Sequence, residues 1–372
     1  MNGHGGNIRA ASRATGIPEE KILDFSASIN PLGVPKKAAK ALTEAIDRLG
    51  HYPEPYAEGL SEHLGRLFGV GADSIICGNG SAELIYLIPR ALKPACVVIP
   101  EPTFSEYERA CRIADTKKVV GFRLKAQEDF DVSPQAFAGK IIEACASGRA
   151  SGRSIGQPGK PGVIAFLCNP NNPTGRLVAR SDVLAVAETA RKHGCYLVVD
   201  EAFLDFCPGE SVLAEVRENP CLIVVRSMTK FYSLSGLRIG YAVMHPSVSR
   251  LVLPYKEPWT VNALAQKAAM EVTKDISFQK ASLTAMAEEK SFMEKELRRL
   301  AIEFTPSRAN YYLLRLDRAP EIKAGLEKKG ILVRDCSNFA GLDHRYLRIA
   351  VRSRRENEIL IGEMERICAP LS

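Results

Sequence analysis

Three short apolar runs, rich in β-branched residues, constrain the fold of this chain most. They read VIAFLC at residues 163–168, CYLVV at 195–199 and CLIVV at 221–225, and turn-forming residues bound each of them. Runs of this length and composition are typical of strands that are buried on both faces, as in a parallel sheet. Polar residues follow each run, and open parallel sheets bind ligands at the carboxyl ends of their strands. The sequence therefore predicts a buried parallel sheet with its chemistry at those strand ends.

Strand-like and helix-like segments alternate over residues 52–243. This alternation predicts an α/β fold, with a mainly parallel sheet covered by helices on both faces in a large domain. We expect a smaller α+β domain built from both chain ends. The expected boundaries are an N-terminal arm with part of the small domain at 1–48, the large domain at 49–265, and the remaining small domain at 266–372.

Four segments carry more local expectations. An amphipathic pattern predicts a helix from about Lys36 to Leu49, and a longer one predicts a connecting helix from about Asn262 to Leu300. The segment ILVRDC at 331–336, which begins with three apolar residues, predicts a strand. The stretch Ser147–Gly162 is dense in Gly, Ser, Pro and Arg, so we expect a surface loop there.

An amide, a carboxylate, an amine and a guanidinium come at or after the expected strand ends: Asn172, Asp200, Lys230 and Arg238, with Ser227 three residues before the lysine. Lysine forms Schiff bases with aldehydes, while hydroxyl and guanidinium groups suit a phosphate dianion. An ionised aspartate keeps a pyridine nitrogen protonated, which makes the ring an electron sink. In this order the residues indicate a site for pyridoxal 5'-phosphate. Singly, they also fit a surface lysine, a helix-capping aspartate and an ordinary turn asparagine.

The string GNGSAE at 78–83 follows the strand-like SIIC and opens a helix. Its backbone N–H groups around Gly80, Ser81 and Ala82 can cradle an anion. It lacks the third glycine of a dinucleotide-binding fingerprint. Further along, Phe104 in EPTFSEY is an aromatic side chain suited either to stacking on a flat ring or to packing in the core.

Composition excludes several other classes of protein. Lysine and arginine exceed aspartate and glutamate by 50 − 43 = 7, which suits an anionic small substrate, and no exposed basic arm points to nucleic acid. The ten cysteines form no CxxC pair or Cys/His cluster, so we expect no metal site and no disulfide scaffold. The first residues lack the apolar core of a secretory signal, and no run approaches the roughly 18 apolar residues of a membrane span. We therefore expect a cytoplasmic protein without a membrane partner.

The strings NNPTG, DEA, SMTKFYSLSGLRIGY and LRIAV, in this order, resemble the fold-type I aminotransferase superfamily of pyridoxal phosphate enzymes, in its histidinol-phosphate aminotransferase-like branch. The resemblance covers essentially the whole chain. Four further strings are similar to the L-threonine-O-3-phosphate decarboxylase family of cobalamin biosynthesis: HGGNI at 4–8, DFSASINPLG at 24–33, PWTVNALA at 258–265 and RANYYLLR at 308–315.

The resemblance implies a role for each candidate cofactor residue. Lys230 would bind the aldehyde, Asp200 the ring nitrogen and Asn172 the ring oxygen, while Phe104 would stack on the ring. The phosphate would be held by Ser81, Ser227, Arg238 and the amides from Gly80 to Ala82.

The same resemblance implies a homodimer with shared active sites. A tyrosine of the partner subunit would reach the cofactor phosphate, with Tyr56 the first candidate and Tyr52 the alternative.

On the substrate side, the resemblance implies that a phosphorylated amino acid contacts His4, Gly5 and Asn172, together with Arg334 and Arg348. Two arginines would form a forked clamp for a molecule carrying both a carboxylate and a phosphate. Arg352 is a further candidate cation, and a solvated residue at a strand end is its simpler reading.

Two residues depart from the patterns of these families. Phe203 stands where related aminotransferases carry a tyrosine whose hydroxyl contacts the ring oxygen. Ser28 stands where the decarboxylases carry an asparagine that faces the substrate, and a serine makes fewer hydrogen bonds.

The resemblance thus implies a lyase, namely pyridoxal-phosphate-dependent decarboxylation of O-phospho-L-threonine to (R)-1-amino-2-propanol O-2-phosphate. The nearest alternative is histidinol-phosphate aminotransferase. An alternative of another class is a non-catalytic sensor or interaction protein with this fold. Phosphoserine also remains open as the substrate.

Overall fold

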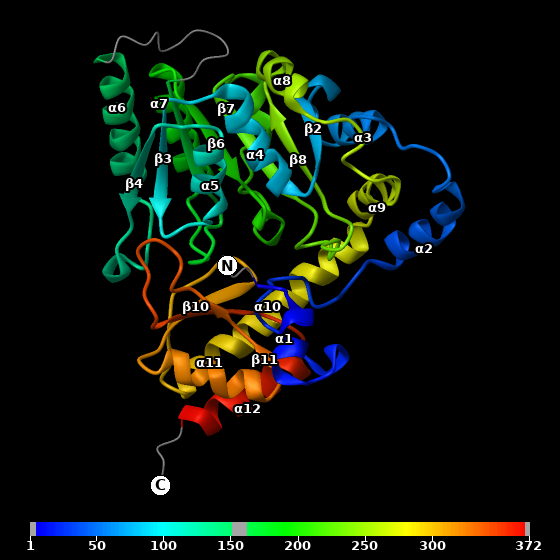
Figure 1. Ribbon diagram of the computed structural model, residues 1–372, viewed down its shortest axis with the longest axis vertical. Helices are drawn as coiled ribbons and strands as arrows, with labels where there is room; N and C mark the ends of the chain where they lie inside the picture. Colours follow the sequence, from blue (N-terminus) through cyan, green and yellow to red (C-terminus); the bar gives the residue numbers. More distant parts are fainter. Residues whose placement is uncertain (1–4, 151–161, 369–372) are drawn as a thin grey trace.

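A seven-stranded sheet forms the centre of the larger lobe in the computed structural model, which describes residues 5–150 and 162–368 (Figure 1). The strand order is β2-β8-β7-β6-β5-β3-β4. Strand β8 is antiparallel to β2 and β7, and the other neighbours are parallel. The strands are β2 (Ile75–Asn79), β3 (Cys96–Glu101), β4 (Lys118–Arg123), β5 (Val163–Cys168), β6 (Tyr196–Asp200), β7 (Leu222–Ser227) and β8 (Ile239–Met244).

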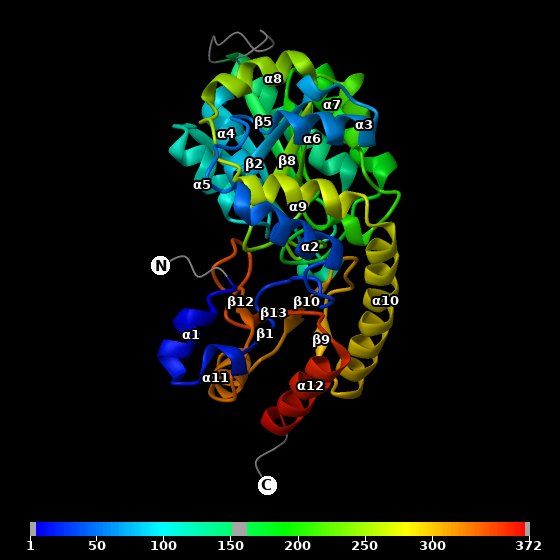
Figure 2. The same cartoon turned by 90° about the vertical axis from the view of Figure 1, so that its right-hand side faces the viewer.

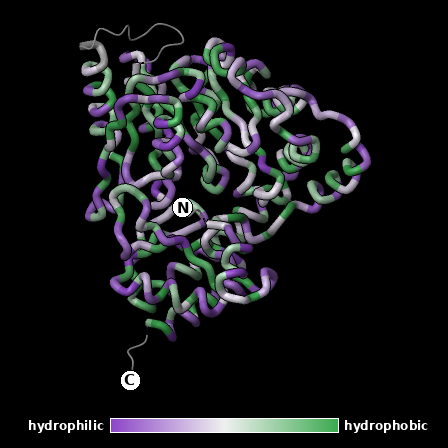
Figure 3. Tube along the Cα trace, in the orientation of Figure 1, coloured by the Kyte–Doolittle hydropathy of each residue, from purple (hydrophilic) through white to green (hydrophobic). Residues whose placement is uncertain are grey.

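The three apolar runs form β5, β6 and β7, which lie side by side at the middle of this sheet, so that prediction is confirmed. Successive side chains of β5 enter two different cores: Ala165 and Leu167 pack on one face, and Ile164 and Phe166 on the other. This alternation explains why the run is apolar throughout, because neither face of the strand meets water. Hydrophobic stretches accordingly concentrate inside the lobe (Figure 3).

Helices cover both faces of the large sheet, as the alternating pattern predicted. One core includes side chains of α4 (Ser81–Leu92), α5 (Glu106–Ile113) and α8 (Pro246–Val252). The opposite core includes side chains of α3 (Glu58–Phe68), α6 (Pro134–Ala150), α7 (Arg180–Lys192) and α9 (Ala263–Thr273). Of the helices that the structure describes, none has the length and apolar character needed to cross a bilayer.

The smaller lobe lies beside the carboxyl ends of the parallel strands and uses both ends of the chain (Figures 1 and 2). Its antiparallel sheet has the order β12-β13-β10-β9, and a separate parallel pair joins β1 to β11. Helices α10 and α11 contact these strands, and α12 packs against both helices. The elements are α1 (Ile8–Thr15), β1 (Leu23–Asp24), α2 (Lys36–Ala45), α10 (Ile276–Arg299), β9 (Glu303–Phe304), β10 (Tyr311–Arg315), α11 (Ala319–Lys328), β11 (Ile331–Leu332), β12 (Arg334–Asp335), β13 (Tyr346–Ala350) and α12 (Arg354–Cys368).

Four local expectations need correction. The long helix expected from Asn262 to Leu300 is two helices, because Asp275 interrupts it and accepts a hydrogen bond from the Phe278 N–H as the N-cap of α10. The strand expected at 331–336 is split between two sheets at Val333, as β11 and β12.

The third correction concerns the loop expected at Ser147–Gly162. Helix α6 continues to Ala150, and residues 151–161 of that stretch lie outside the described part of the chain. The helix expected to Leu49 ends earlier: α2 stops at Ala45 and a short 3₁₀ turn follows over Ile46–Arg48. The domain boundaries stay a prediction.

Candidate active site

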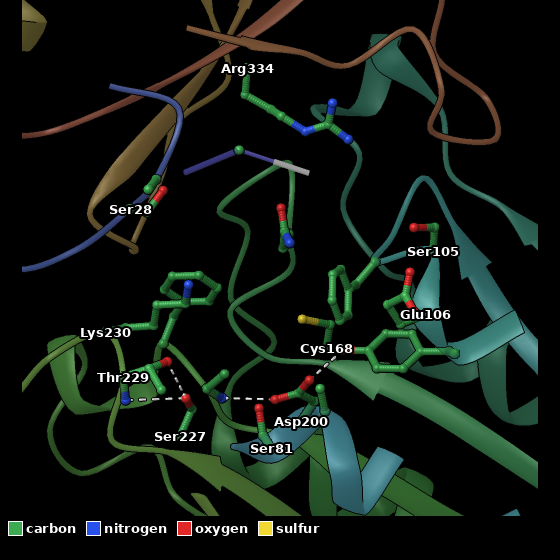
Figure 4. A pocket seen from close by; sticks show the side chains of 18 of the residues that line it. Ser28, Ser81, Ser105, Glu106, Cys168, Asp200, Ser227, Thr229, Lys230 and Arg334 are labelled. Carbon is green, nitrogen blue, oxygen red and sulfur yellow. Dashed lines mark hydrogen bonds between the residues drawn. The ribbon is translucent and has the colours of Figure 1, made fainter. Parts of the chain in front are cut away.

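A cavity of about 480 Å³ lies between the carboxyl ends of the parallel strands and the smaller lobe. Figure 4 shows Lys230, Asp200 and Ser81 along one side of it, with Ser28 and Arg334 of the smaller lobe on the other. Most residues predicted for a site line this cavity: Gly5, Ser28, Ser81, Ala82, Phe104, Asn172, Asp200, Ser227, Lys230, Arg238, Arg334 and Arg348. Residues scattered over the whole sequence therefore meet at one place.

The corner of the cavity at the start of α4 is built for an anion. Gly80 has a φ of 79°, and a side chain there would overlap the guanidinium of Arg238. Gly240 on β8 allows equally close packing, because an added Cβ would lie 2.5 Å from the Ser81 backbone nitrogen. The helix N-terminus, the guanidinium and the hydroxyl of Ser227 thus converge with no Cβ between them.

The hydroxyl of Ser227 is itself held in place. Its Oγ lies 2.7 Å from Oγ1 of Thr229, and it accepts a hydrogen bond from the Thr229 backbone N–H. Thr229 also lines the cavity, directly before Lys230 in the sequence. The local turn therefore presents two hydroxyls and an amine to the same space.

Lys230 has an environment that favours its neutral amine. Burial, and after it the nearby guanidinium groups of Arg348 and Arg238, lower its pKa to about 8, against the opposing charges of Asp200 and Asp24. A neutral amine is the nucleophilic form of lysine.

Asp200 ends β6 at the floor of the cavity. Burial raises its pKa to about 6, while two hydrogen bonds act in the opposite direction. Tyr107 donates its hydroxyl to Oδ2 at 2.7 Å, and the Ala202 backbone N–H donates to Oδ1 at 2.9 Å. A buried carboxylate held only by neutral donors suits a cationic partner in the cavity.

Asn172 connects the larger lobe to the smaller lobe at the cavity. Nη1 of Arg348 donates to its side-chain oxygen, so the amide N–H groups of Asn172 remain for a ligand. The guanidinium of Arg348 lies over the ring of Tyr311, at 4.9 Å from its centroid. Phe203 packs edge-on against the same tyrosine, with ring centroids 5.0 Å apart.

Arg334 and Arg348 stand directly opposite each other on the neighbouring antiparallel strands β12 and β13. Arg334 is fixed by donating to the Asp335 carbonyl at 2.6 Å and to Oδ1 of Asn338 at 2.8 Å, with Phe339 beneath its guanidinium. Within the described residues, Ser28 Oγ and Arg348 Nε are buried without a hydrogen-bond partner. Buried polar atoms of this kind are normally satisfied, which points to a polar ligand.

The N-terminal arm approaches this region closely. Gly5 lines the cavity and packs on Ser26 so tightly that a Cβ would overlap the Ser26 carbonyl. The Gly6 N–H donates to Ser26 Oγ at 2.9 Å, and that hydroxyl donates to Oδ1 of Asp24 at 2.5 Å. His4, the other candidate of the arm, lies outside the described residues.

Three candidates lie away from the cavity. Tyr56 and its alternative Tyr52 are not among the lining residues and are 37% and 87% exposed. Arg352 pairs with Glu356 at 2.7 Å and donates to the Asp24 carbonyl, so its charge is used within the smaller lobe.

Sequence reasoning missed Tyr107 and Thr229, which touch the candidate residues directly. Spacing offered a signal for both. Tyr107 follows Phe104 by three positions, and it lies in the first turn of the helix that begins at Glu106. Thr229 stands between two predicted site residues. Other unpredicted lining residues are Ser26, Ala27, Ser105, Glu106, Arg109, Cys168, Ala202, Phe203 and Phe339.

The donor set fits pyridoxal 5'-phosphate. A partly buried amine, a buried carboxylate, an aromatic ring (Phe104) and the N-terminus of α4 all open into one cavity. The described residues contain no group of three or more His, Cys, Asp or Glu side chains arranged to hold a metal ion. A mainly parallel α/β sheet with this cavity at its strand ends defines a pyridoxal phosphate enzyme of fold type I.

Comparison with known proteins gives the family. A model of the family Aminotransferase class I and II matches residues 20–364. The chain is 35% identical to threonine-phosphate decarboxylase of Salmonella typhimurium, over 98% of this chain and 96% of that protein. It is 33% identical to histidinol-phosphate aminotransferase of Thermoanaerobacter sp., over 94% of each. The crystal structure of L-threonine-O-3-phosphate decarboxylase from Porphyromonas gingivalis matches with a TM-score of 0.78 and 29% identity, covering 93% of this chain and 99% of that one.

The chain therefore belongs to the class I and II aminotransferase family. Its cofactor is pyridoxal 5'-phosphate, as the sequence predicted. The matches include both decarboxylases and aminotransferases, so the family alone does not decide the reaction.

Proposed function

We propose that this protein is a pyridoxal-phosphate-dependent decarboxylase that converts O-phospho-L-threonine to (R)-1-amino-2-propanol O-2-phosphate, a step of cobalamin side-chain synthesis. The observation that carries the proposal is that Arg334 on β12 and Arg348 on β13 lie directly opposite each other. Two adjacent guanidinium groups at one wall of the cavity suit a substrate with two anionic groups, a carboxylate and a phosphate. The 35% identity to a threonine-phosphate decarboxylase supports the same choice.

Residues of the larger lobe would hold the cofactor. Lys230 would bind its aldehyde carbon, Asp200 its ring nitrogen and Asn172 its ring oxygen, with Phe104 stacked on the ring. The phosphate would lie at the corner formed by Gly80, Ser81 and Ala82 together with Ser227 and Arg238, and Tyr56 of a partner subunit would complete it. When bound, pyridoxal phosphate withdraws electrons from a bond of the substrate carbon that carries the amino group.

Orientation by this chain's residues would choose which bond breaks. The arginine pair would fix carboxylate and phosphate together, so that the bond from Cα to the carboxylate, and not the Cα–H bond, stands perpendicular to the ring. Ser28 Oγ, buried without a partner in the described part, would donate to or accept from the same substrate. Gly5, with His4 beside it in the sequence, would cover it from the arm.

Proton return completes the reaction. Loss of CO₂ leaves an electron pair at Cα, which must take up one proton. Lys230, whose pKa is lowered to about 8, can carry that proton at Nζ and release it near neutral pH. Phe203 brings no hydroxyl near the ring, unlike the tyrosine expected in related aminotransferases.

Parallel product assays by mass spectrometry test the proposal. The purified enzyme with added cofactor is given phosphothreonine, phosphoserine, or histidinol phosphate with 2-oxoglutarate. We expect CO₂ and aminopropanol phosphate from phosphothreonine, with little product from the other two. Glutamate formed from histidinol phosphate, with no CO₂ from phosphothreonine, would instead establish histidinol-phosphate aminotransferase, which the 33% identical relative makes the second candidate.

Variants of the arginine pair sharpen this test. Arg334→Lys keeps a charge but loses the forked donor geometry, so we expect kcat/KM for phosphothreonine to fall about 10- to 100-fold. Arg315→Lys is the matched control, because Arg315 ends strand β10 and pairs with Glu303 on the exposed side of the same sheet. A lysine at position 315 should leave the reaction unchanged. No product from any substrate, while Lys230 still binds the cofactor, would favour a non-catalytic protein.

A further inference from the structure

Tyr107 contacts two of the candidate cofactor residues at once. Its hydroxyl donates to Oδ2 of Asp200 at 2.7 Å. Its ring meets Phe104 edge-on, with centroids 5.6 Å apart, and stacks on Phe166 at 4.8 Å with an interplanar angle of 14°. The side chain is fully buried. A single tyrosine therefore joins the side chain expected to cover the ring to the side chain expected beneath its nitrogen.

The fold leaves Tyr107 little freedom. It lies in the first turn of α5, where its backbone N–H donates to the Phe104 carbonyl at 3.3 Å. Phe166 belongs to the central strand β5, and Asp200 ends the neighbouring strand β6. The aromatic stack thus fixes the phenol ring, and the ring aims its hydroxyl at one carboxylate oxygen.

Charge explains why this hydrogen bond matters. Asp200 is deeply buried, and burial disfavours its ionised form. Burial also raises the pKa of Tyr107 well above its ordinary value, so the phenol stays protonated and is the donor in its hydrogen bond to the carboxylate. Of the groups around Asp200, Lys230 favours the carboxylate, whereas Glu201 beside it and the buried thiol of Cys168 do not. Tyr107 is therefore the side-chain donor that keeps the carboxylate ionised.

We propose that Tyr107 is a positioning residue for the cofactor: it holds Asp200 ionised and oriented toward the pyridine nitrogen, and so strengthens cofactor binding and ring protonation. The proposal rests on the assignment of Asp200 to the ring nitrogen made under the proposed function. It does not depend on which substrate is used.

The test compares Tyr107→Phe with the wild type, because this change removes only the hydroxyl and keeps the aromatic stack. Binding of pyridoxal phosphate to the apoprotein is measured by fluorescence titration. We expect about tenfold weaker binding, the size of a lost hydrogen bond to a charged group. We also expect the visible absorbance of the bound cofactor to change with pH at lower pH values than in the wild type, because the ring nitrogen then loses its proton more readily.

Tyr312→Phe is the matched control. Tyr312 is also a fully buried tyrosine, and its hydroxyl donates to Oε1 of Glu294 at 2.7 Å, but it does not line the cavity. This variant should bind the cofactor like the wild type. An equal loss of affinity in both variants would show a general loss of packing and would overturn the proposal.

A double-variant cycle separates the possible failures. If Tyr107 acts through Asp200, Tyr107→Phe should weaken binding much less in an Asp200→Asn background than in the wild type. Equal losses in both backgrounds would reject action through Asp200. If Asp200→Asn alone leaves affinity and absorbance unchanged, the assignment of Asp200 itself fails. If Asp200→Asn weakens binding but Tyr107→Phe does not, only the role of Tyr107 is rejected.

Discussion

Asp200 is a residue whose proposed role opposes the stability of the protein that carries it. Its pKa is raised to about 6 from an ordinary value near 3.8. Because one pKa unit corresponds to about 1.4 kcal/mol, burial of the ionised carboxylate costs the folded apoprotein roughly 3 kcal/mol above pH 6. A folded-state pKa above the unfolded value means that this cost is absent below about pH 4, grows between about pH 4 and pH 6, and stays constant above that.

Asp200→Asn should therefore stabilise the apoprotein. We expect a gain of about 1 to 3 kcal/mol in the free energy of unfolding at pH 7.5, shrinking as the pH is lowered toward 5. With the cofactor bound the order should reverse, because asparagine is no charged partner for the ring nitrogen. Urea unfolding at several pH values, with and without pyridoxal phosphate, measures both effects. A variant apoprotein less stable than the wild type at every pH would contradict this account.

For single residues, the sequence predicted which side chains belong to the site better than it predicted the side chains that contact them. Lys230, Asp200 and Asn172 could be chosen because each follows an apolar strand, and the cavity does contain them. The hydrogen bond from Tyr107 could not be predicted, because it depends on the side-by-side order of β5 and β6 and on the angle at which α5 packs.

The NNPTG segment acts as a structural element that joins the two lobes. The Gly175 carbonyl accepts from the Arg308 N–H at 2.8 Å, and the Tyr311 hydroxyl donates to the Asn171 carbonyl at 2.8 Å. Lys290 holds the same crossing by donating to the carbonyls of Ser307 and Ala309, at 2.7 and 2.8 Å. The sequence indicated a turn near the cofactor, but this docking joins residues far apart in the chain and has no local signature.

Gly175→Ala should destabilise this junction. Gly175 has a φ of 74°, and an added Cβ would lie 2.6 Å from the Ser307 Cβ. Backbone strain and overlap together should cost about 2 to 4 kcal/mol in thermal unfolding. Adding Ser307→Gly removes the overlap but not the strained backbone, so the double variant should regain about half of the lost stability. Ser307→Gly alone is the control. If the double variant is no more stable than Gly175→Ala, the overlap with Ser307 is not the cause of the destabilisation.

The N-terminal arm is a second element whose placement depends on one side chain. Ser26 bridges the Gly6 N–H to Asp24. Ser26→Ala should release the arm, so the KM for phosphothreonine should rise about 3- to 10-fold while cofactor affinity stays unchanged. Ser277→Ala removes a similar serine-to-aspartate bond, 2.7 Å long to Asp275, at the start of α10 and away from the cavity. That control should keep the wild-type KM, and a matching rise in both variants would argue against a role for the arm.

For the molecule as a whole, the alternation of apolar runs predicted a sheet between layers of helices, but not which strands are neighbours in the sheet. The parallel centre of the sheet follows from runs that are apolar throughout, whereas the antiparallel placement of β8 next to β2 depends on how the chain returns across the sheet. In the smaller lobe, Val333 separates two strands that the sequence predicted as one, and the second strand places Arg334 opposite Arg348.

Exposed apolar side chains mark the surface where we expect a second subunit. Tyr52 is 87% exposed and contacts Trp259, itself 50% exposed, with ring centroids 5.6 Å apart. Ile46 and Leu49 are also more than half exposed in the segment between α2 and α3, at the right of Figure 1. Clusters of this kind commonly bind another protein surface. Tyr56 lies in the same segment and outside the cavity of its own chain, as a tyrosine contributed to a partner's site would.

Hybrid dimers test this arrangement directly. Lys230→Ala and Tyr56→Ala proteins, each expected to have little activity, are unfolded together and refolded as a mixture. If each site takes Lys230 from one subunit and Tyr56 from the other, half of the dimers are hybrids with one intact site, and roughly one quarter of the wild-type activity returns. If both residues served the same subunit's site, a hybrid would contain two defective sites and no activity would return. Refolding each variant alone is the control, and sedimentation measures whether dimers form at all.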